Sequence, residues 1–131
     1  MPVNSQPYLF DTGALIDIYR GRQRVRPYFD ALAHQSAYVS VISEAELWMG
    51  LRPGEISRHE ALLNYFIPLP INSAVARMAG GWMQRYRPQG LGWMDALITA
   101  SAKYAGAAVL TRDLHLASVL AEDAEFVVYA E

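Results

Sequence analysis

The sequence predicts one α/β domain in which a mostly parallel, five-stranded sheet carries helices on both faces. Short apolar runs alternate along the chain with longer segments whose apolar residues recur at helical spacing. No tight hairpin turn joins consecutive strand-like runs, so we expect the strands to run in one direction with helices as connections. The chain has 131 residues, of which 53% are hydrophobic, and this is enough for the core of a single domain covering the whole chain.

The five strands are predicted from short local patterns. Residues 8–10 (YLF) and 107–111 (AAVLT) are almost wholly apolar, which is typical of strands covered on both faces. Residues 36–43 (SAYVSVIS) and 126–129 (FVVY) are rich in β-branched and aromatic side chains. The two prolines of 67–71 (IPLPI) make that segment a short edge strand, because proline donates no hydrogen bond to a neighbouring strand.

The helices are predicted from apolar spacing and from the residues that begin or end them. Gly21 ends the first helix, Asn72 caps the fifth, and Gly106 closes the strongly helical segment WMDALITASAKYAG. The predicted helices cover residues 14–21, 25–33, 43–51, 56–66, 73–87, 93–106 and 112–121. Together with the strands, they give an alternating order typical of a doubly covered parallel sheet.

Composition narrows the class of protein. Without cysteine, the chain can form neither a disulfide framework nor a thiolate metal site. Its net charge of −2 is not the signature of a nucleic-acid-binding protein, although local patches count for more than the total. The start MPVNSQP does not resemble a secretory signal, and no apolar run approaches the roughly 18 residues of a membrane span. We therefore expect a cytoplasmic protein that does not enter a membrane.

Acidic residues follow three of the predicted strands. Asp11 comes directly after the first strand, Glu44 and Glu46 follow the second, and Asp113 follows the fourth. Parallel strands end at one edge of the sheet, which is also where such sheets bind ligands. A further acid, Asp95, lies near the start of a largely apolar helix, where a carboxylate is unexpected. These acids are therefore predicted to meet at one edge.

Each of these acids also has a purely structural interpretation. Asp11 and Asp113 each precede a helix and would serve as N-caps. Glu46 follows Ser43 at the spacing of a capping box, and Asp95 lies in a first helical turn, where the helix dipole favours a negative charge. No single residue decides between the two interpretations, so the functional one depends on their convergence.

Converged carboxylates raise one another's pKa and destabilise a fold unless a cation neutralises them. Mg²⁺ or Mn²⁺ prefers such oxygen ligands, and one or two ions at this edge would activate water and clamp a phosphodiester. Three neighbours of the acids, Thr12, Thr111 and Arg112, would contact metal-bound water or substrate phosphate, or would serve only as caps and surface residues.

Four segments that carry these acids resemble the PIN domain family, and within it the toxin nucleases of bacterial VapBC-type toxin–antitoxin modules. YLFDTGALIDIYRG is similar to the first family motif and VSVISEAELWMGL to the second. GWMDALITASA resembles the third motif and VLTRDLHL the fourth, so the resemblance covers nearly the whole chain. Trp93 and Met94 are bulkier than the residues that often precede the third acid, which would reshape the substrate groove.

The resemblance implies a PIN-like three-layer sandwich and a Mg²⁺- or Mn²⁺-dependent endoribonuclease. It implies that the protein is the toxin of a type II toxin–antitoxin system, with RNA as substrate, a homodimeric state and a cognate antitoxin with which it forms a hetero-oligomer. The residues that it assigns to catalysis and metal binding are Asp11, Glu46, Asp95 and Asp113. In the second motif, the resemblance assigns the catalytic role to Glu46, the acid that precedes leucine, and Glu44 is the alternative.

Several other polar and aromatic residues have open interpretations. Six arginines would contact RNA phosphates or an antitoxin, or would simply be solvated: Arg20, Arg22, Arg24, Arg26, Arg85 and Arg87. Trp48, Trp82 and Trp93 would stack on bases or pack in the core or an interface. Four acids that interrupt helical apolar patterns are expected to be exposed: Asp17, Asp30, Glu55 and Glu60.

Two other functions compete with the nuclease. In the first, the domain is a catalytically silent PIN-like module for binding or dimerisation, and its carboxylates only cap helices. In the second, Asp11 forms an aspartyl-phosphate in a phosphatase, but such enzymes usually have another acid two residues later, where this chain has Gly13.

Overall fold

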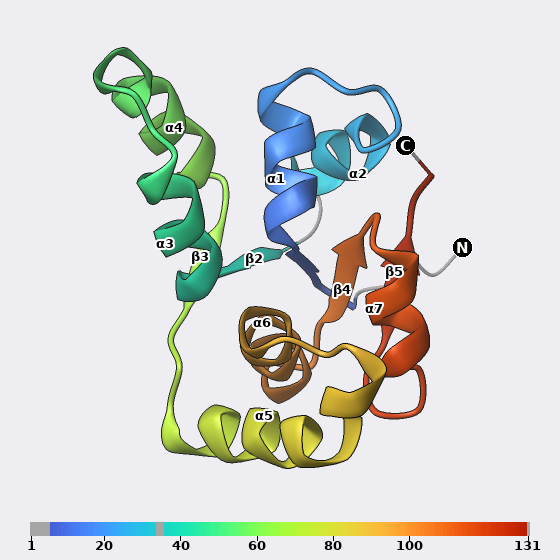
Figure 1. Ribbon diagram of the computed structural model, residues 1–131. Coiled ribbons are helices and arrows are strands. Elements are labelled where there is room, and N and C mark those ends of the chain that lie inside the picture. The colour runs from blue at the N-terminus through green and yellow to red at the C-terminus, as the bar shows by residue number, and fades with distance from the viewer. Residues whose placement is uncertain (1–5, 34–35, 131) are drawn as a thin grey trace.

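The structure, a computed structural model, describes residues 6–33 and 36–130 and arranges them in three layers (Figure 1). Within these residues, five parallel strands form one sheet in the order β3-β2-β1-β4-β5. The strands are β1 (Tyr8–Phe10), β2 (Ala37–Ser40), β3 (Ile67–Leu69), β4 (Ala108–Thr111) and β5 (Phe126–Val128). The predicted α/β fold with a five-stranded parallel sheet is therefore confirmed.

The helices cover both faces of this sheet. They are α1 (Thr12–Tyr19), α2 (Arg26–Asp30), α3 (Val41–Met49), α4 (Ile56–Leu63), α5 (Ser73–Tyr86), α6 (Trp93–Tyr104) and α7 (Leu114–Val119). Short 3-10 turns are formed by Ala31–Ala33, Pro53–Glu55 and Arg87–Gln89. In Figure 1, α1 and α2 lie above the sheet, α6 and α5 lie below it, and α3 and α4 stand together at one side.

Successive residues of each strand point to opposite faces, and this divides the core. Phe10 and Leu110 pack with Leu15 of α1 on one face. Leu9 packs with Ile98 of α6 on the other. The neighbouring strands β1 and β4 are thus buried on both faces, which explains why their sequences are almost continuously apolar.

The chain reverses its path through the sheet between β1 and β4. It passes from β1 outward to β2 and β3, and then returns to the other side of β1 to form β4 and β5. In a parallel sheet, such a reversal opens a crevice at the carboxyl ends of the two strands. Asp11 follows β1 and Asp113 follows β4, so both lie beside this crevice.

Most predicted helix boundaries agree with the structure. Asn72 caps α5 by accepting a hydrogen bond from the backbone N–H of Val75 at 2.9 Å, and Gly106 adopts a φ of 73° after α6. The edge position of β3 is confirmed as well. No helix in the described ranges has both the length and the apolar character to cross a membrane. Residues 1–5 of the segment that was compared with a secretory signal lie outside the described residues.

Three elements end earlier in the structure than predicted. The strand predicted for 36–43 ends at Ser40, because the Ser40 hydroxyl accepts a hydrogen bond from the N–H of Ile42 at 3.1 Å and so begins α3. The helix predicted for 25–33 is α-helical only as far as Asp30 and continues as a 3-10 turn. The helix predicted for 56–66 ends at Leu63, where the chain turns into β3.

Asp17 was predicted to be exposed, and this prediction is wrong. Its side chain is completely buried between α1 and the sheet. Arg112 and Tyr129 form bonds with its two oxygens and so satisfy the charge. The pattern of α1 alone could not reveal this, because both partners lie about a hundred residues further along the chain.

Candidate active site

The structure brings the four predicted acids together at the carboxyl edge of the sheet. Burial raises the pKa of Asp95, and the nearby charges of the other three acids raise it further, to about 6. Burial is also the main reason why the pKa of Asp11 is raised, and the charges of Asp113 and Glu46 raise it further. The four carboxylates therefore form one electrostatically coupled group, which we call the acid cluster.

Asp11 stands at the start of α1 and is almost fully buried. Its Oδ1 accepts a hydrogen bond from the N–H of Thr12 at 2.8 Å. Its Oδ2 accepts one from the hydroxyl of Thr111, also at 2.8 Å. Asp11 is thus an N-cap and a member of the acid cluster at the same time, and these bonds fix the direction of its carboxylate.

Thr111 connects two members of the cluster. Its buried hydroxyl donates to Asp11 and accepts a hydrogen bond from the N–H of Asp113 at 2.9 Å. Asp113 in turn caps α7, since its Oδ1 accepts from the N–H of Leu116 at 3.0 Å. The other oxygen of Asp113 has no bond within the described chain. Thr111 thereby sets the spacing of the acids that follow β1 and β4.

Glu46 is held by Thr12. The Thr12 hydroxyl donates to Glu46 Oε1 at 2.6 Å, and it lies 2.7 Å from the hydroxyl of Ser43. Since the only proton of the Thr12 hydroxyl goes to Glu46, Ser43 must donate to Thr12. The predicted capping box of Ser43 and Glu46 is wrong, because α3 begins earlier and is capped by Ser40. Both residues instead connect α3 to α1.

Asp95 lies in the first turn of α6 and is half-buried. Its carboxylate has no hydrogen-bond partner among the described residues, in contrast to the other three acids. No basic side chain lowers its pKa, whereas three carboxylates raise it. Asp95 is therefore the acid whose charge the protein stabilises least.

Arg112 lies beside the cluster but is directed away from it. Its Nη1 donates to the buried Asp17 Oδ1 at 2.7 Å, and the hydroxyl of Tyr129 donates to Asp17 Oδ2 at 2.6 Å. The guanidinium passes close to Gly13, where an added Cβ would lie 3.3 Å from Arg112 Nε. The charge of Arg112 is thus used inside the protein, and this argues against its predicted contact with substrate phosphate.

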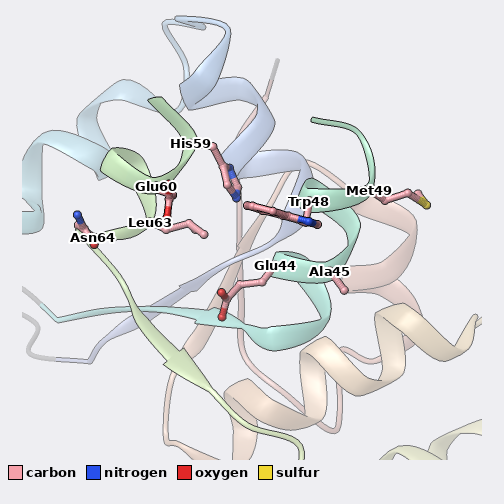
Figure 2. A pocket seen from close by; sticks show the side chains of 8 residues that line it. All are labelled: Glu44, Ala45, Trp48, Met49, His59, Glu60, Leu63 and Asn64. Carbon is pink, nitrogen blue, oxygen red and sulfur yellow. The ribbon is translucent and has the colours of Figure 1, made fainter. Parts of the chain in front are cut away.

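Glu44, the alternative to Glu46, faces a different part of the surface. Figure 2 shows its side chain on α3 at the edge of a depression of about 640 Å³ that Trp48 and the α4 residues His59 and Leu63 also line. His59 is buried there, and its Nε2 has no partner among the described residues. The structure therefore separates the two glutamates and places only Glu46 in the acid cluster.

The donor set of the acid cluster suits a hard cation. Among the described residues, no three acids or histidines are grouped tightly enough to ligate one ion directly. However, Mg²⁺ in proteins usually takes only one or two carboxylates and keeps several waters. Oxygens without a protein partner among the described residues remain on Asp113, Glu46 and Asp95, and burial, together with the charges of the other three acids, raises the pKa of Asp95. These residues fit a hydrated Mg²⁺ or Mn²⁺.

Comparison with known proteins identifies the family. The family model for the PIN domain matches residues 8–121. The chain belongs to the PIN domain family. A curated relative of this PIN domain, ribonuclease VapC10 of Mycobacterium tuberculosis, is 35% identical over an alignment of 116 residues, and the match covers 85% of this chain and 80% of the relative.

Solved structures resemble the PIN domain over almost its whole length. A toxin–antitoxin complex from Klebsiella pneumoniae has a chain with 25% identity and a TM-score of 0.78, and the match covers 92% of this chain and 96% of that one. FitAcB from Neisseria gonorrhoeae has 27% identity and a TM-score of 0.72, and the match covers 91% of this chain and 95% of that one. VapBC2 from Rickettsia felis shares the fold at a TM-score of 0.81 but only 16% identity, with coverages of 95% and 99%.

Proposed function

We propose that this PIN domain is a Mg²⁺- or Mn²⁺-dependent endoribonuclease and acts as the toxin of a type II toxin–antitoxin system. The observation that carries the proposal is the acid cluster, in which Asp11, Glu46, Asp95 and Asp113 meet beside the crevice between β1 and β4. The curated relative, which is named a ribonuclease, supports the choice of RNA as substrate.

Asp11, Asp95 and Asp113 would hold the metal, and Glu46 would contribute a fourth carboxylate from α3. When bound, the ion supplies a water nucleophile at neutral pH and charge stabilisation for the phosphodiester that is hydrolysed. The protein supplies orientation: Thr111 fixes the carboxylate of Asp11, and Thr12 fixes that of Glu46. Burial of these bonds keeps the oxygens in place before substrate arrives.

The silent-module alternative explains only half of the cluster. Asp11 and Asp113 do cap helices, as that alternative requires. Glu46, however, bonds to a threonine of another helix, and Asp95 has no capping bond within the described residues although its position raises its pKa. A protein without metal chemistry has no use for this unfavourable charge, and we therefore favour the nuclease.

The decisive experiment is RNA cleavage by the purified protein with and without divalent metal. Cleavage is expected with Mg²⁺ or Mn²⁺ and not with EDTA, and Asp11→Asn should reduce it by at least about 100-fold while the fold is retained. Glu44→Gln is the matched control, because it removes a nearby acid that lies outside the cluster, and it should cleave normally. Metal-independent cleavage or an active Asp11→Asn variant would contradict the proposal.

We also propose a cognate antitoxin and a homodimeric state. Chains of similar fold occur in structures described as toxin–antitoxin complexes, which supports an antitoxin partner. The protein encoded next to this one should copurify with it and suppress RNA cleavage. Sedimentation of the isolated domain should give twice the mass of one chain, and a monomer would contradict the second part of the proposal.

A further inference from the structure

A second depression, of about 760 Å³, lies beside the start of α6. Six residues of α5, α6 and the turn between them line it: Gly80, Met83, Gln84, Arg87, Pro88 and Trp93. Its volume is within the range of small-ligand sites, and it combines an aromatic face with a cation and an amide. We call it the Trp93 depression.

Three side chains of the Trp93 depression have no partner within the described protein. Trp93 exposes 51% of its surface and stacks on no other ring. Arg87 pairs with no carboxylate, and Gln84 forms no hydrogen bond. An indole face stacks on an unpaired base, a guanidinium pairs with phosphate, and an amide reads a base edge. The chemistry of the three groups matches the parts of one nucleotide.

Two parts of the wall of the Trp93 depression are close in sequence to members of the acid cluster. Trp93 precedes Asp95 by two residues at the start of α6. The opposite wall is the turn after α5, and His115 holds it by donating from Nε2 to the backbone oxygen of Gln89 at 2.9 Å. His115 follows Asp113 by two residues. Asp95 and Asp113 therefore lie within two residues of Trp93 and of the histidine that contacts this turn.

Besides the proposed metal ion, basic side chains would favour the approach of a negatively charged substrate to four carboxylates. Arg112 does not serve this purpose, because its guanidinium is bonded to the buried Asp17. Arg26 pairs with Asp30 at 3.2 Å, beyond the far end of α1 from Asp11. Arg87 is a cation without a pairing carboxylate in the described protein and lies in the Trp93 depression.

We propose that the Trp93 depression binds an unpaired nucleotide of single-stranded RNA, with its base on Trp93 and its phosphate on Arg87. The inference rests on the proposed ribonuclease function and assigns a nucleotide subsite outside the acid cluster. Duplex RNA is excluded as the preferred ligand because a base that is stacked within a helix cannot also lie on the indole.

The test measures binding separately from cleavage. A fluorescein-labelled single-stranded oligoribonucleotide is titrated against Asp11→Asn protein, and anisotropy gives the dissociation constant. Adding Trp93→Ala should weaken binding by about 5- to 150-fold, the usual effect of losing one base–aromatic stack. Trp48→Ala is the matched control, since Trp48 is equally exposed at 55% but lies in the depression of Figure 2, and it should bind normally.

Arg87 is tested in the same way. Arg87→Gln should weaken binding and flatten its salt dependence, because one phosphate contact is lost. Arg85→Gln is its control, since Arg85 lies over the ring of Tyr86 and outside the depression. Circular dichroism and melting temperature confirm that each variant is folded.

Several outcomes would overturn this inference. Equal binding by the Trp93→Ala and Trp48→Ala proteins, or equal affinity for duplex RNA, would do so. So would a Trp93→Ala protein that becomes monomeric but binds RNA normally, because a second copy of the chain would then occupy the depression. Cleavage by the protein with native Asp11 is measured independently. If RNA is cleaved but Trp93 has no effect, the depression is wrongly assigned while the proposed function stands.

Discussion

Two groups of carboxylates in this domain have opposite electrostatic environments. Asp17 is completely buried, but one basic side chain and one hydroxyl are bonded to its two oxygens. The acid cluster is only partly buried, and no basic side chain stabilises Asp95 within it. The fold therefore provides a positive countercharge at Asp17. At the acid cluster it leaves negative charge uncompensated, and a metal ion would supply the countercharge there.

The same comparison separates structure from function. The bond from Arg112 to Asp17 ties the β4–α7 corner to α1, and it runs beside Thr111, which connects Asp11 to Asp113. Asp17 thus stabilises the frame in which the acid cluster is held. Removing charge should consequently have opposite effects on stability at the two places.

The largest expected effect is at Asp17. Asp17→Asn removes the buried charge that accepts hydrogen bonds from Arg112 and Tyr129 and should lower the free energy of unfolding by about 1.5 to 3 kcal/mol, the usual net contribution of a hydrogen bond to a charged group. Urea denaturation measures this change. The control is Asp30→Asn, which breaks the solvent-exposed pair with Arg26 and should cost less than about 1 kcal/mol. Equal losses in the two variants would show that burial of Asp17 is not what matters.

The opposite sign is expected at Asp95. Its pKa is about 6 in the folded chain, compared with about 3.9 when unfolded, so the folded state binds the proton more tightly. Its charge therefore destabilises the fold above pH 6, and this loss disappears as the pH falls below about 4. In metal-free buffer, Asp95→Asn should raise the free energy of unfolding by about 1 to 2 kcal/mol at pH 7.5 and not at pH 4. A gain that is independent of pH would point to packing instead.

Divalent metal should raise the stability of the native protein, as Asp95→Asn is expected to do without metal. At ten times its dissociation constant, Mg²⁺ that binds only the folded state adds about 1.4 kcal/mol, which raises the melting temperature by about 3 to 8 °C. The shift should be absent in a variant that combines Asp11→Asn and Asp113→Asn. If the native protein shows no shift at saturating Mn²⁺ or Mg²⁺, the cluster does not bind metal in the absence of RNA.

The smallest effect on stability is expected at Thr12. Thr12→Val removes the hydroxyl that orients Glu46 and should cost about 0.5 to 1.5 kcal/mol, the usual net contribution of one hydrogen bond. RNA cleavage should fall more steeply, by about 10- to 100-fold, because a positioned ligand is released. Thr12→Ser retains the hydroxyl and should restore both values. An inactive Thr12→Ser protein would show that the methyl group, not the hydrogen bond, is required.

The outline of this domain could be predicted from local patterns. Short apolar runs identify the strands, because a strand that is buried on both faces is apolar throughout. Apolar residues at helical spacing identify the helices, because each helix buries only one side against the sheet. Asn72 and Gly106 mark helix ends through bonds and dihedral angles that involve only their neighbours. The same reasoning placed Asp11, Asp113 and a glutamate after β2 at one edge, since parallel strands deliver the residues after them there. Asp95 follows no strand, and the choice of Glu46 over Glu44 came from the family resemblance.

The tertiary structure alone decided the contacts between distant residues. Asp17 has the same helical spacing as an exposed acid, and its burial depends on Arg112, which is 95 positions away. Ser43 and Glu46 have the spacing of a capping box, but their hydroxyl partner comes from α1. The sequence determined which residues reach the carboxyl edge of the sheet. Which bonds they form there depends on how α1, α3 and the β4–α7 corner pack, because a hydrogen bond requires an approach within about 3 Å that no local pattern specifies.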